Sequence, residues 1–345
     1  MATPIGSIIR AATRRPDEKY NVLSYVTHER YSSCMAGCNA DFHLLCNGPG
    51  VKGEWIKQYA DVPKNHILLP KFNQNPLEVI PSWTDVDFCM GQHRFGQAQH
   101  ALQLAQYFSC PSLVLEHTTV TNKQLEDARE QLKQVRGDIN VFISKSSAEA
   151  WGWDLNDPSV EIIHHGVDTN LFKQAFAIDE QIQPHILCVV NDWRNRGDIL
   201  GFDIFERVCG NNKLPVRVLG DNPGISQPPP NIYSLVKAYQ ECSIFYNTSR
   251  HSPIPTVILE AMACGKPVVT TDNYLISDII INGYNGYKTN SEAEQLKHLR
   301  RLLKDPAECR ELGLNARKTI LDHFNLPTFV ERWNNVFDKL SKIRK

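Results

Sequence analysis

The sequence predicts an α/β fold of two domains, each with a parallel sheet covered by helices. Short apolar, β-branched runs alternate with amphipathic runs from Tyr20 onward, and this alternation is typical of parallel sheets. The chain has 345 residues, more than one core usually holds, so two domains are expected. No apolar run reaches the roughly 18 residues that a membrane-spanning helix needs.

The composition restricts the class of partner and the compartment. The net charge is −1, whereas proteins that bind nucleic acid usually carry a basic excess. Nucleic acid is therefore not favoured as a partner, although a local basic patch stays open. The ten cysteines form no C-x-x-C pair, which is typical of reduced thiols in a cytoplasmic protein.

Residues 1–19 are predicted to be a flexible leader. They contain Arg10, Arg14 and Arg15 among small residues, and no acidic residue precedes Asp17. A transit peptide has a similar composition, but the similarity is faint and a disordered leader is the better interpretation.

The first domain is predicted from strands and helices that alternate along the chain. Apolar runs predict strands at 21–26, 66–69, 86–90, 112–115 and 139–143, and helical spacing predicts helices at 97–108 and 122–134. Ligands of parallel sheets bind at the carboxyl ends of the strands, so residues that follow strands are site candidates.

Five such residues stand out. His28 and Arg30 follow the first strand, His93 and Arg94 follow the third, and His117 follows the strand at 112–115. A solvated turn is an equal alternative for His28 and Arg30, and a lone histidine is more often structural than functional.

The second domain repeats the alternation. Strands are predicted at 185–190, 216–220, 244–246 and 268–271, and helices at 235–242, 276–281, 292–304 and 307–323. A last helix, basic toward its end, is predicted over 324–345.

The stretch 252–272 predicts a helix followed by a buried strand. Pro255 fits the first turn of the helix, which leaves the amides of Thr256 and Val257 as unpaired donors at a positive helix end that binds phosphate readily. Glu260 lies four residues after Thr256 and shares its face, where a carboxylate could accept ribose hydroxyls. The alternative is a solvated helix glutamate.

Residues 259–269, Leu-Glu-Ala-Met-Ala-Cys-Gly-Lys-Pro-Val-Val, resemble the C-terminal signature of glycosyltransferase family 4, the glycosyl transferases group 1. The resemblance implies the GT-B fold, with two Rossmann-like domains whose parallel sheets face each other across a cleft. It implies an acceptor domain over 20–168 and a nucleotide-sugar domain over 169–324. The helix at 325–345 would pack back on the first domain.

The resemblance also assigns roles to residues. Glu260 matches the second glutamate of the family motif, which contacts the nucleotide ribose, and Ser252 stands where the family has its first glutamate, which contacts the donor sugar. Arg196 occupies the position of the family's phosphate-binding lysine, and the arginine position falls on Asn191, so that Arg194 would substitute for it. A charged surface loop is the alternative for both arginines.

Three further roles follow from position within the family pattern. His117 matches a histidine beside the donor sugar, and Gly220 is the first glycine of a donor-binding turn. His28, Arg30, His93 and Arg94 are placed on the acceptor side.

The implied reaction is transfer of a sugar from a nucleotide-diphosphate sugar, UDP- or GDP-linked, to an acceptor hydroxyl with retention of configuration. No cofactor and no metal ion is expected. Two alternatives stay open. The first is a nucleotide-binding GT-B protein with weak or no transferase activity, because Ser252 replaces a motif glutamate. The second is a phage-type transferase acting on modified DNA.

Overall fold

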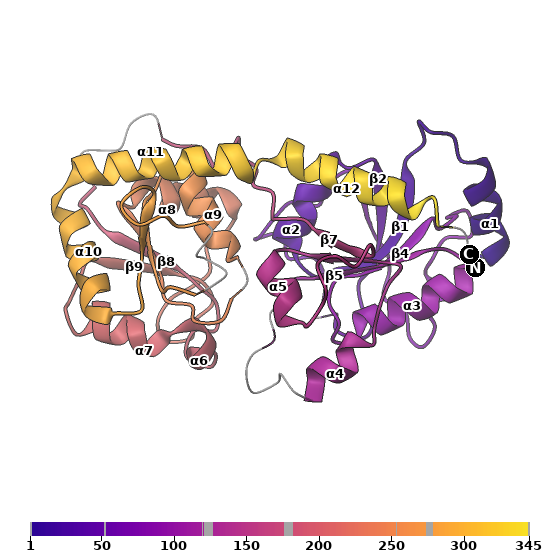
Figure 1. Ribbon diagram of the computed structural model, residues 1–345, viewed down its shortest axis with the longest axis horizontal. Coiled ribbons are helices and arrows are strands. Elements are labelled where there is room, and N and C mark those ends of the chain that lie inside the picture. Colours follow the sequence, from indigo (N-terminus) through magenta and orange to yellow (C-terminus); the bar gives the residue numbers. More distant parts are fainter. Residues whose placement is uncertain are drawn as a thin grey trace. The chain divides into compact units, whose positions relative to one another are not determined.

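Two parallel sheets organise the chain in the computed structural model (Figure 1). The structure describes residues 2–51, 53–118, 120, 127–175, 182–252, 254–273 and 279–343. One unit consists of Met1–His164 and Pro327–Lys345, and the second of His165–Leu326. We refer to them as unit 1 and unit 2. The predicted α/β class with parallel sheets is confirmed.

Unit 1 contains a seven-stranded sheet in the order β3-β2-β1-β4-β5-β6-β7, with all pairs parallel. The strands are β1 (Tyr20–Tyr25), β2 (Ala40–Leu45), β3 (His66–Leu68), β4 (Phe88–Gly91), β5 (Ser112–Glu116), β6 (Ile139–Phe142) and β7 (Val160–Ile162). The strand order reverses between β1 and β4, and ligands of open α/β sheets bind at such a point.

The helices of unit 1 are α1 (Pro4–Thr13), α2 (Glu29–Cys34), α3 (Gln97–Phe108), α4 (Asp127–Lys133), α5 (Lys145–Ala150) and α12 (Leu326–Leu340), with 3-10 turns η1 (Met35–Gly37) and η2 (Pro76–Glu78). Helix α3 has the predicted bounds. It packs so closely on β4 that a side chain at Gly91 would lie 2.7 Å from the Ala98 Cα. The first residues of the helix predicted at 122–134 lie outside the described residues.

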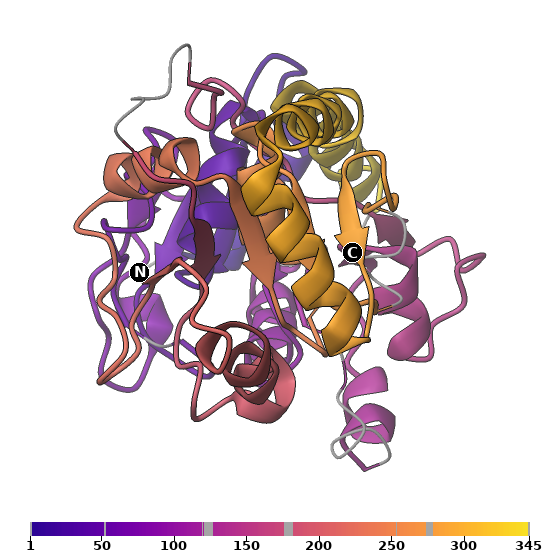
Figure 2. The ribbon, with the colours of Figure 1, turned by 90° about the vertical axis from the view of Figure 1, so that its left-hand side faces the viewer.

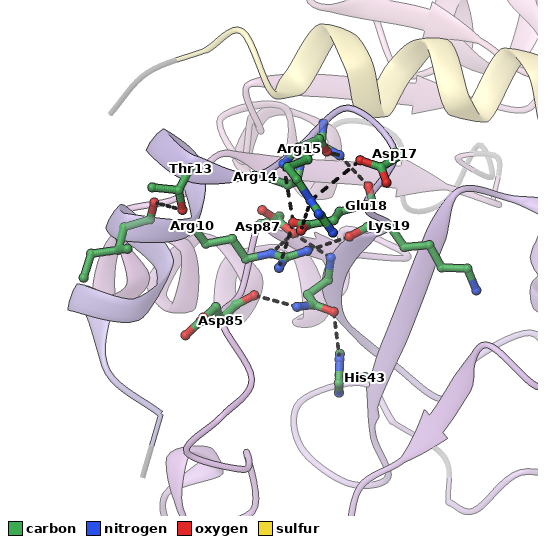
Figure 3. A network of polar contacts seen from close by, with 12 residues as sticks. Arg10, Thr13, Arg14, Arg15, Asp17, Glu18, Lys19, His43, Asp85 and Asp87 are labelled. Atoms are coloured by element: carbon green, nitrogen blue, oxygen red, sulfur yellow. Dashed lines mark hydrogen bonds and ion pairs between the residues drawn. The ribbon is translucent and has the colours of Figure 1, made fainter.

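The prediction of a flexible leader is wrong for residues 4–13, which form α1. The Nε of Arg10 donates to the Asp87 carboxylate at 2.8 Å, and the same oxygen accepts the Asn21 amide at 2.7 Å (Figure 3). The Ser7 hydroxyl accepts the Val86 amide at 3.0 Å. Polar contacts to residues distant in sequence therefore hold this helix, and composition alone could not indicate them.

The last helix, α12, packs within unit 1. The Tyr20 hydroxyl donates to Asp338 at 2.9 Å, and the Trp333 indole donates to the Tyr31 hydroxyl at 3.1 Å. The Phe337 ring stacks on Phe88 with an interplanar angle of 12°. One face of α12 thus covers β1 and β4.

Unit 2 contains a five-stranded parallel sheet in the order β12-β11-β10-β8-β9. The strands are β8 (Ile186–Val189), β9 (Val216–Leu219), β10 (Ile244–Asn247), β11 (Val268–Thr270) and β12 (Gly286–Lys288). The order reverses between β8 and β10, so the carboxyl ends of these two strands mark the position where a ligand is expected.

Helices cover both faces of the second sheet. They are α6 (Gly197–Leu200), α7 (Phe202–Phe205), the π-helix η3 (Glu206–Gly210), α8 (Ile232–Glu241), α9 (Thr256–Ala263), α10 (Glu292–Lys304) and α11 (Pro306–His323). One core joins the sheet to α8, α9 and α11, and another joins it to α7, η3 and α10, which lies in front of the strands in Figure 2. Half of the helix predicted at 276–281 lies outside the described residues, and the prediction is wrong for 279–281, which are not helical.

Within the described ranges, no helix combines the length and the apolar character needed to cross a bilayer.

Candidate functional site

The amino end of α9 lies at the carboxyl edge of the unit 2 sheet, because the helix follows β10 directly. Pro255 is the N-cap rather than the first helical residue, and in the described chain no side chain caps the helix. The Ile258 amide bonds to the Pro255 carbonyl at 3.0 Å, while Thr256 and Val257 occupy the first two helical positions. Their amides have no acceptor within the helix, so the helix end suits an anion. Ser252, half-buried, precedes it.

Glu260 lies one turn into α9 and is only 4% exposed. Its Oε2 accepts a hydrogen bond from the Tyr239 hydroxyl at 2.9 Å. The interpretation of a solvated helix glutamate is therefore wrong. A buried carboxylate must be hydrogen-bonded to be tolerated, and Tyr239 meets part of that need. The sequence indicated Glu260 but not Tyr239, which belongs to a helix with its own apolar face.

The loop after β8 carries both predicted phosphate-binding arginines. Arg194 and Arg196 are exposed. The Arg194 guanidinium lies 5.2 Å from the centre of the Phe202 ring, and the Arg196 carbonyl accepts the Leu200 amide at 2.8 Å. The backbone at Arg196 thus begins α6, and its side chain is left to solvent. Two cations at the edge where a ligand is expected favour an anionic ligand.

Gly220 ends β9 in a conformation that needs glycine. Its φ is +126°, and a Cβ there would lie 1.8 Å from the Val190 carbonyl oxygen. Asn191, at the position where an arginine was expected, accepts the Asp221 amide with its Oδ1 at 2.8 Å. Asn222 adds a second link, because its side chain donates to the Val190 carbonyl at 2.7 Å. The loops after β8 and β9 therefore form one hydrogen-bonded edge.

The loop between β10 and α9 is held against the end of α6. The Thr248 hydroxyl donates to the Leu200 carbonyl at 2.7 Å, and the Arg250 amide donates to the Ile199 carbonyl at 2.8 Å. The Arg250 guanidinium binds both carboxylate oxygens of Asp203, at 2.8 and 2.6 Å. This guanidinium is the main cause that lowers the pKa of Asp203 well below its usual range. Sequence reasoning missed this pair, because its members are far apart along the chain.

A small hollow opens between these loops at the carboxyl ends of β8 and β10. It is lined by Cys188, Val189, Val190, Trp193, Leu200, Tyr246, Asn247, Thr248 and Ser249. The hollow coincides with the reversal of strand order in unit 2.

Unit 1 brings two of the predicted residues together. His117 is 7% exposed, and the centre of its ring lies 4.7 Å from that of His28 and 4.5 Å from that of Tyr31. His28 is exposed and is the N-cap residue of α2, and Arg30 is half-buried on that helix. The cluster formed by His28, Tyr31 and His117 thus presents an imidazole at the surface beside a buried one.

The placement of Arg94 on the acceptor side is wrong. Arg94 is 0% exposed, and its Nη1 lies 3.4 Å from the carboxylate of Glu116, which is also 0% exposed. The rings of Phe142 and Trp153 surround the guanidinium at 4.9 and 4.8 Å from their centres. Arg94 is part of the core, where burial lowers its pKa and Glu116 opposes that shift.

His93 remains a site candidate. It is half-buried, and its Nε2 lies 3.1 Å from the Gly50 carbonyl oxygen. This contact connects the loop after β4 to the loop after β2, at the reversal of strand order in unit 1.

Two carboxylates of unit 1 have Asp-x-Asp spacing, which the sequence argument overlooked. Asp87 is 8% exposed and accepts hydrogen bonds from Arg10 (Figure 3) and from the Asn21 amide. Asp85 packs against Gly6. In the ranges that the structure describes, no group of three His, Cys, Asp or Glu side chains could hold a metal ion. Independence from metal stays a prediction.

Comparison with known proteins finds a family that is similar to part of unit 2. Residues 227–319 match the model described as glycosyl transferases group 1. This segment of unit 2 is similar to that family. The matched residues contain Ser252, Thr256, Val257 and Glu260, whereas Arg194, Arg196 and Gly220 precede them.

Two curated proteins are similar to this chain over short segments. Alpha-1,3/1,6-mannosyltransferase ALG2 of Dictyostelium discoideum is 26% identical over 100 residues, which are 29% of this chain and 23% of that protein. Alpha-maltose-1-phosphate synthase of Mycolicibacterium smegmatis is 29% identical over 107 residues, which are 29% of this chain and 28% of that protein. The chain thus matches about a quarter of the length of these relatives.

Solved structures agree over almost the whole chain. HepE of Anabaena in complex with UDP has a TM-score of 0.67 at 14% identity, covering 93% of this chain and 100% of that one. Sucrose-phosphate synthase of Thermosynechococcus elongatus has a TM-score of 0.66 at 15% identity, covering 94% and 99%. The GT-B fold that the sequence predicted is confirmed by its likeness to these two structures.

Proposed function

We propose that this chain is a retaining glycosyltransferase that moves a sugar from a nucleotide-diphosphate sugar to an acceptor hydroxyl without a catalytic metal ion. The uncapped amino end of α9, with buried Glu260 one turn below it in the family segment, carries the proposal. HepE of Anabaena was solved with UDP-glucose, so UDP-glucose is the first donor to test and a GDP-linked hexose is the second.

The donor diphosphate binds to unit 2 in this proposal. The amides of Thr256 and Val257 point at one phosphate, and the exposed guanidinium groups of Arg194 and Arg196 neutralise the charge. Negative charge on the diphosphate grows as the bond to the sugar lengthens. Donors that are already oriented stabilise this charge without reorganising, so they lower the barrier.

Glu260 accepts the ribose hydroxyls in this proposal, and Tyr239 orients its carboxylate. The hydrogen bond from Tyr239 at 2.9 Å limits the rotation of the carboxylate. Such orientation reduces the conformational entropy that nucleotide binding would otherwise cost.

The remaining roles fall to unit 1. We assign the donor sugar to His117, and the acceptor to His28, Arg30 and His93, which are exposed or half-buried. Ser252 of unit 2 offers a hydroxyl to the sugar in place of the motif glutamate.

Calorimetry with UDP and GDP, followed by a donor-hydrolysis assay with UDP-glucose, tests the proposal. We expect Glu260→Gln to weaken binding of the nucleoside diphosphate roughly tenfold or more, because a hydrogen bond to a charged group contributes about 1.5–3 kcal/mol. Tyr239→Phe should weaken binding less. Glu311→Gln is the matched control, because Glu311 is exposed on α11 of the same unit.

Three outcomes would contradict the proposal. Unchanged nucleotide affinity in Glu260→Gln removes the role of Glu260. Nucleotide binding without any consumption of donor indicates a binding protein without transferase activity. A gel shift with modified DNA that disappears steeply with salt would assign a nucleic-acid acceptor instead of a generic hydroxyl.

A further inference from the structure

Arg207 lies at the centre of a chain of ion pairs in unit 2. Its Nε donates to both carboxylate oxygens of Glu292, at 3.1 and 2.9 Å, and its Nη2 donates to the same carboxylate at 2.7 Å. The Nη2 also donates to the Asp203 carboxylate at 2.8 Å, and Arg250 binds that carboxylate with two further hydrogen bonds. We refer to Glu292, Arg207, Asp203 and Arg250, connected in this order, as the Arg207 bridge.

The Arg207 bridge joins elements that are far apart in the sequence. Glu292 begins α10, Arg207 belongs to η3, Asp203 belongs to α7, and Arg250 lies in the loop between β10 and α9. Helix α10 packs with α7 and η3 in one core of unit 2. None of the donor-binding residues proposed above comes from α10, so the bridge connects the donor site to a helix outside it.

The geometry of the Arg207 bridge favours a contribution to structure although its side chains are partly exposed. An exposed ion pair usually contributes little, and the exceptions are bidentate pairs and networks. Arg207 forms a bidentate pair with Glu292, and Arg250 forms one with Asp203. One carboxylate oxygen of Asp203 connects the two pairs, at 2.8 Å from Arg207 and 2.6 Å from Arg250. The bridge therefore restricts the side chains of both arginines.

Arg250 connects the two loops to which the donor diphosphate is assigned. The amides of Arg250 and His251 donate to the Ile199 carbonyl at 2.8 and 3.2 Å. The Arg250 guanidinium also donates to the Gly197 carbonyl at 3.4 Å, and Gly197 directly follows Arg196. The loop that leads to the amino end of α9 thus meets the loop after β8 at the Arg250 side chain.

We propose that Arg207 is a positioning residue for the donor, acting through Asp203 and Arg250 to hold the loop between β10 and α9 beside the loop after β8. The inference rests on the proposed function, because that function assigns the donor diphosphate to these loops. Arg207 itself touches no substrate. By restricting the loop before the donor arrives, the Arg207 bridge reduces the conformational entropy that donor binding would otherwise cost.

Hydrogen exchange of the full chain tests the position of the loop without any nucleotide. Arg207→Gln removes the charge that holds both carboxylates, so we expect faster exchange in peptides that cover residues 244–252, which contain the Arg250 amide. Arg217→Gln is the matched control and should leave this exchange unchanged. Arg217 lies on the edge strand β9, is 46% exposed where Arg207 is 49% exposed, and pairs with Glu241 at 3.1 Å.

Calorimetry with UDP measures the consequence for the donor site. Arg207→Gln should weaken UDP binding roughly threefold to fivefold, which is the upper part of the range that an exposed ion pair supplies. Arg217→Gln should leave the affinity unchanged. The double variant Arg207→Gln/Asp203→Asn should bind UDP no more weakly than Asp203→Asn, because Arg207 acts through Asp203. If Arg207 acted on the anion directly through its charge, its effect would persist in the double variant.

Two results would overturn the role of Arg207. The first is unchanged exchange over residues 244–252 in Arg207→Gln. The second is an effect of Arg207→Gln on UDP affinity that adds in full to the effect of Asp203→Asn. Failure of the unmodified chain to bind UDP and GDP would overturn the proposed function instead, and the exchange measurement would still decide whether Arg207 holds the loop.

Discussion

Arg94→Met tests whether Arg94 belongs to the core of unit 1 or to a site. Methionine keeps most of the apolar stem but removes the guanidinium that faces Glu116 at 3.4 Å. Both residues are 0% exposed, so the substitution leaves a carboxylate in the core without its cation. Breaking a buried ion pair costs about 3–5 kcal/mol.

The contacts of Glu116 place the expected loss at the lower end of this range. Its Oε1 still accepts the Thr118 amide and hydroxyl at 2.9 and 2.7 Å, and its Oε2 still accepts the backbone amide of residue 94 at 3.0 Å. We therefore expect a loss of about 3 kcal/mol in the free energy of unfolding of unit 1. For a unit of this size the loss lowers Tm by roughly 6–12 °C.

Differential scanning calorimetry of the full chain measures this change, and tryptophan fluorescence assigns it, since Trp153 adjoins Arg94. His93→Ala is the control at the neighbouring, half-buried position, and its effect should stay below about 1 kcal/mol. Arg94→Met/Glu116→Leu should recover part of the loss, because an apolar pair replaces a broken ion pair. An unchanged Tm together with weaker acceptor binding would refute the core assignment and restore Arg94 to the site.

Three further predictions concern other parts of the structure. Gly220→Ala should destabilise unit 2 by more than about 2 kcal/mol in urea unfolding, because φ is +126° and the new Cβ meets the Val190 carbonyl; a loss within error contradicts this turn geometry. Burial lowers the pKa of His66 to about 4. Between about pH 6.5 and pH 4 the unfolded chain therefore binds more protons than the folded chain. The folded state loses stability as the pH falls through this window. His66→Gln should flatten that pH dependence in urea titrations, and an unaltered slope would contradict it. Asp203→Asn should weaken UDP binding several-fold, because it releases Arg250 from its two hydrogen bonds. An affinity equal to that of the unmodified chain would show that this contact does not position the loop between β10 and α9.

Local pattern was sufficient for the elements that carry their own signals. Helix α10 has the predicted bounds, 292–304, because its apolar spacing and its N-cap, where Ser291 accepts the Glu294 amide, are both encoded nearby. Strands β5 and β10 were predicted from short apolar runs. Strand β2 (Ala40–Leu45) was missed, since polar residues interrupt its run and only its pairing with β1 and β3 buries it.

The burial of polar side chains that follow strands could not be predicted from local pattern. Arg94 and His117 both follow strands of unit 1, and no local pattern distinguishes one from the other. Arg94 entered the core because Glu116 and a set of aromatic rings enclose it, whereas His117 packs against exposed His28. Whether a polar side chain is a structural or a functional group depends on partners contributed by other elements.

The sequence by itself determined the α/β class, the parallel strands and the segment 252–272, because periodicity, glycine and proline act over a few residues. The tertiary structure alone decided the burial of Glu260 against Tyr239, the contact of Arg250 with Asp203 and that of Arg207 with Glu292. These features depend on residues that are distant along the chain, and folding determines which of them meet.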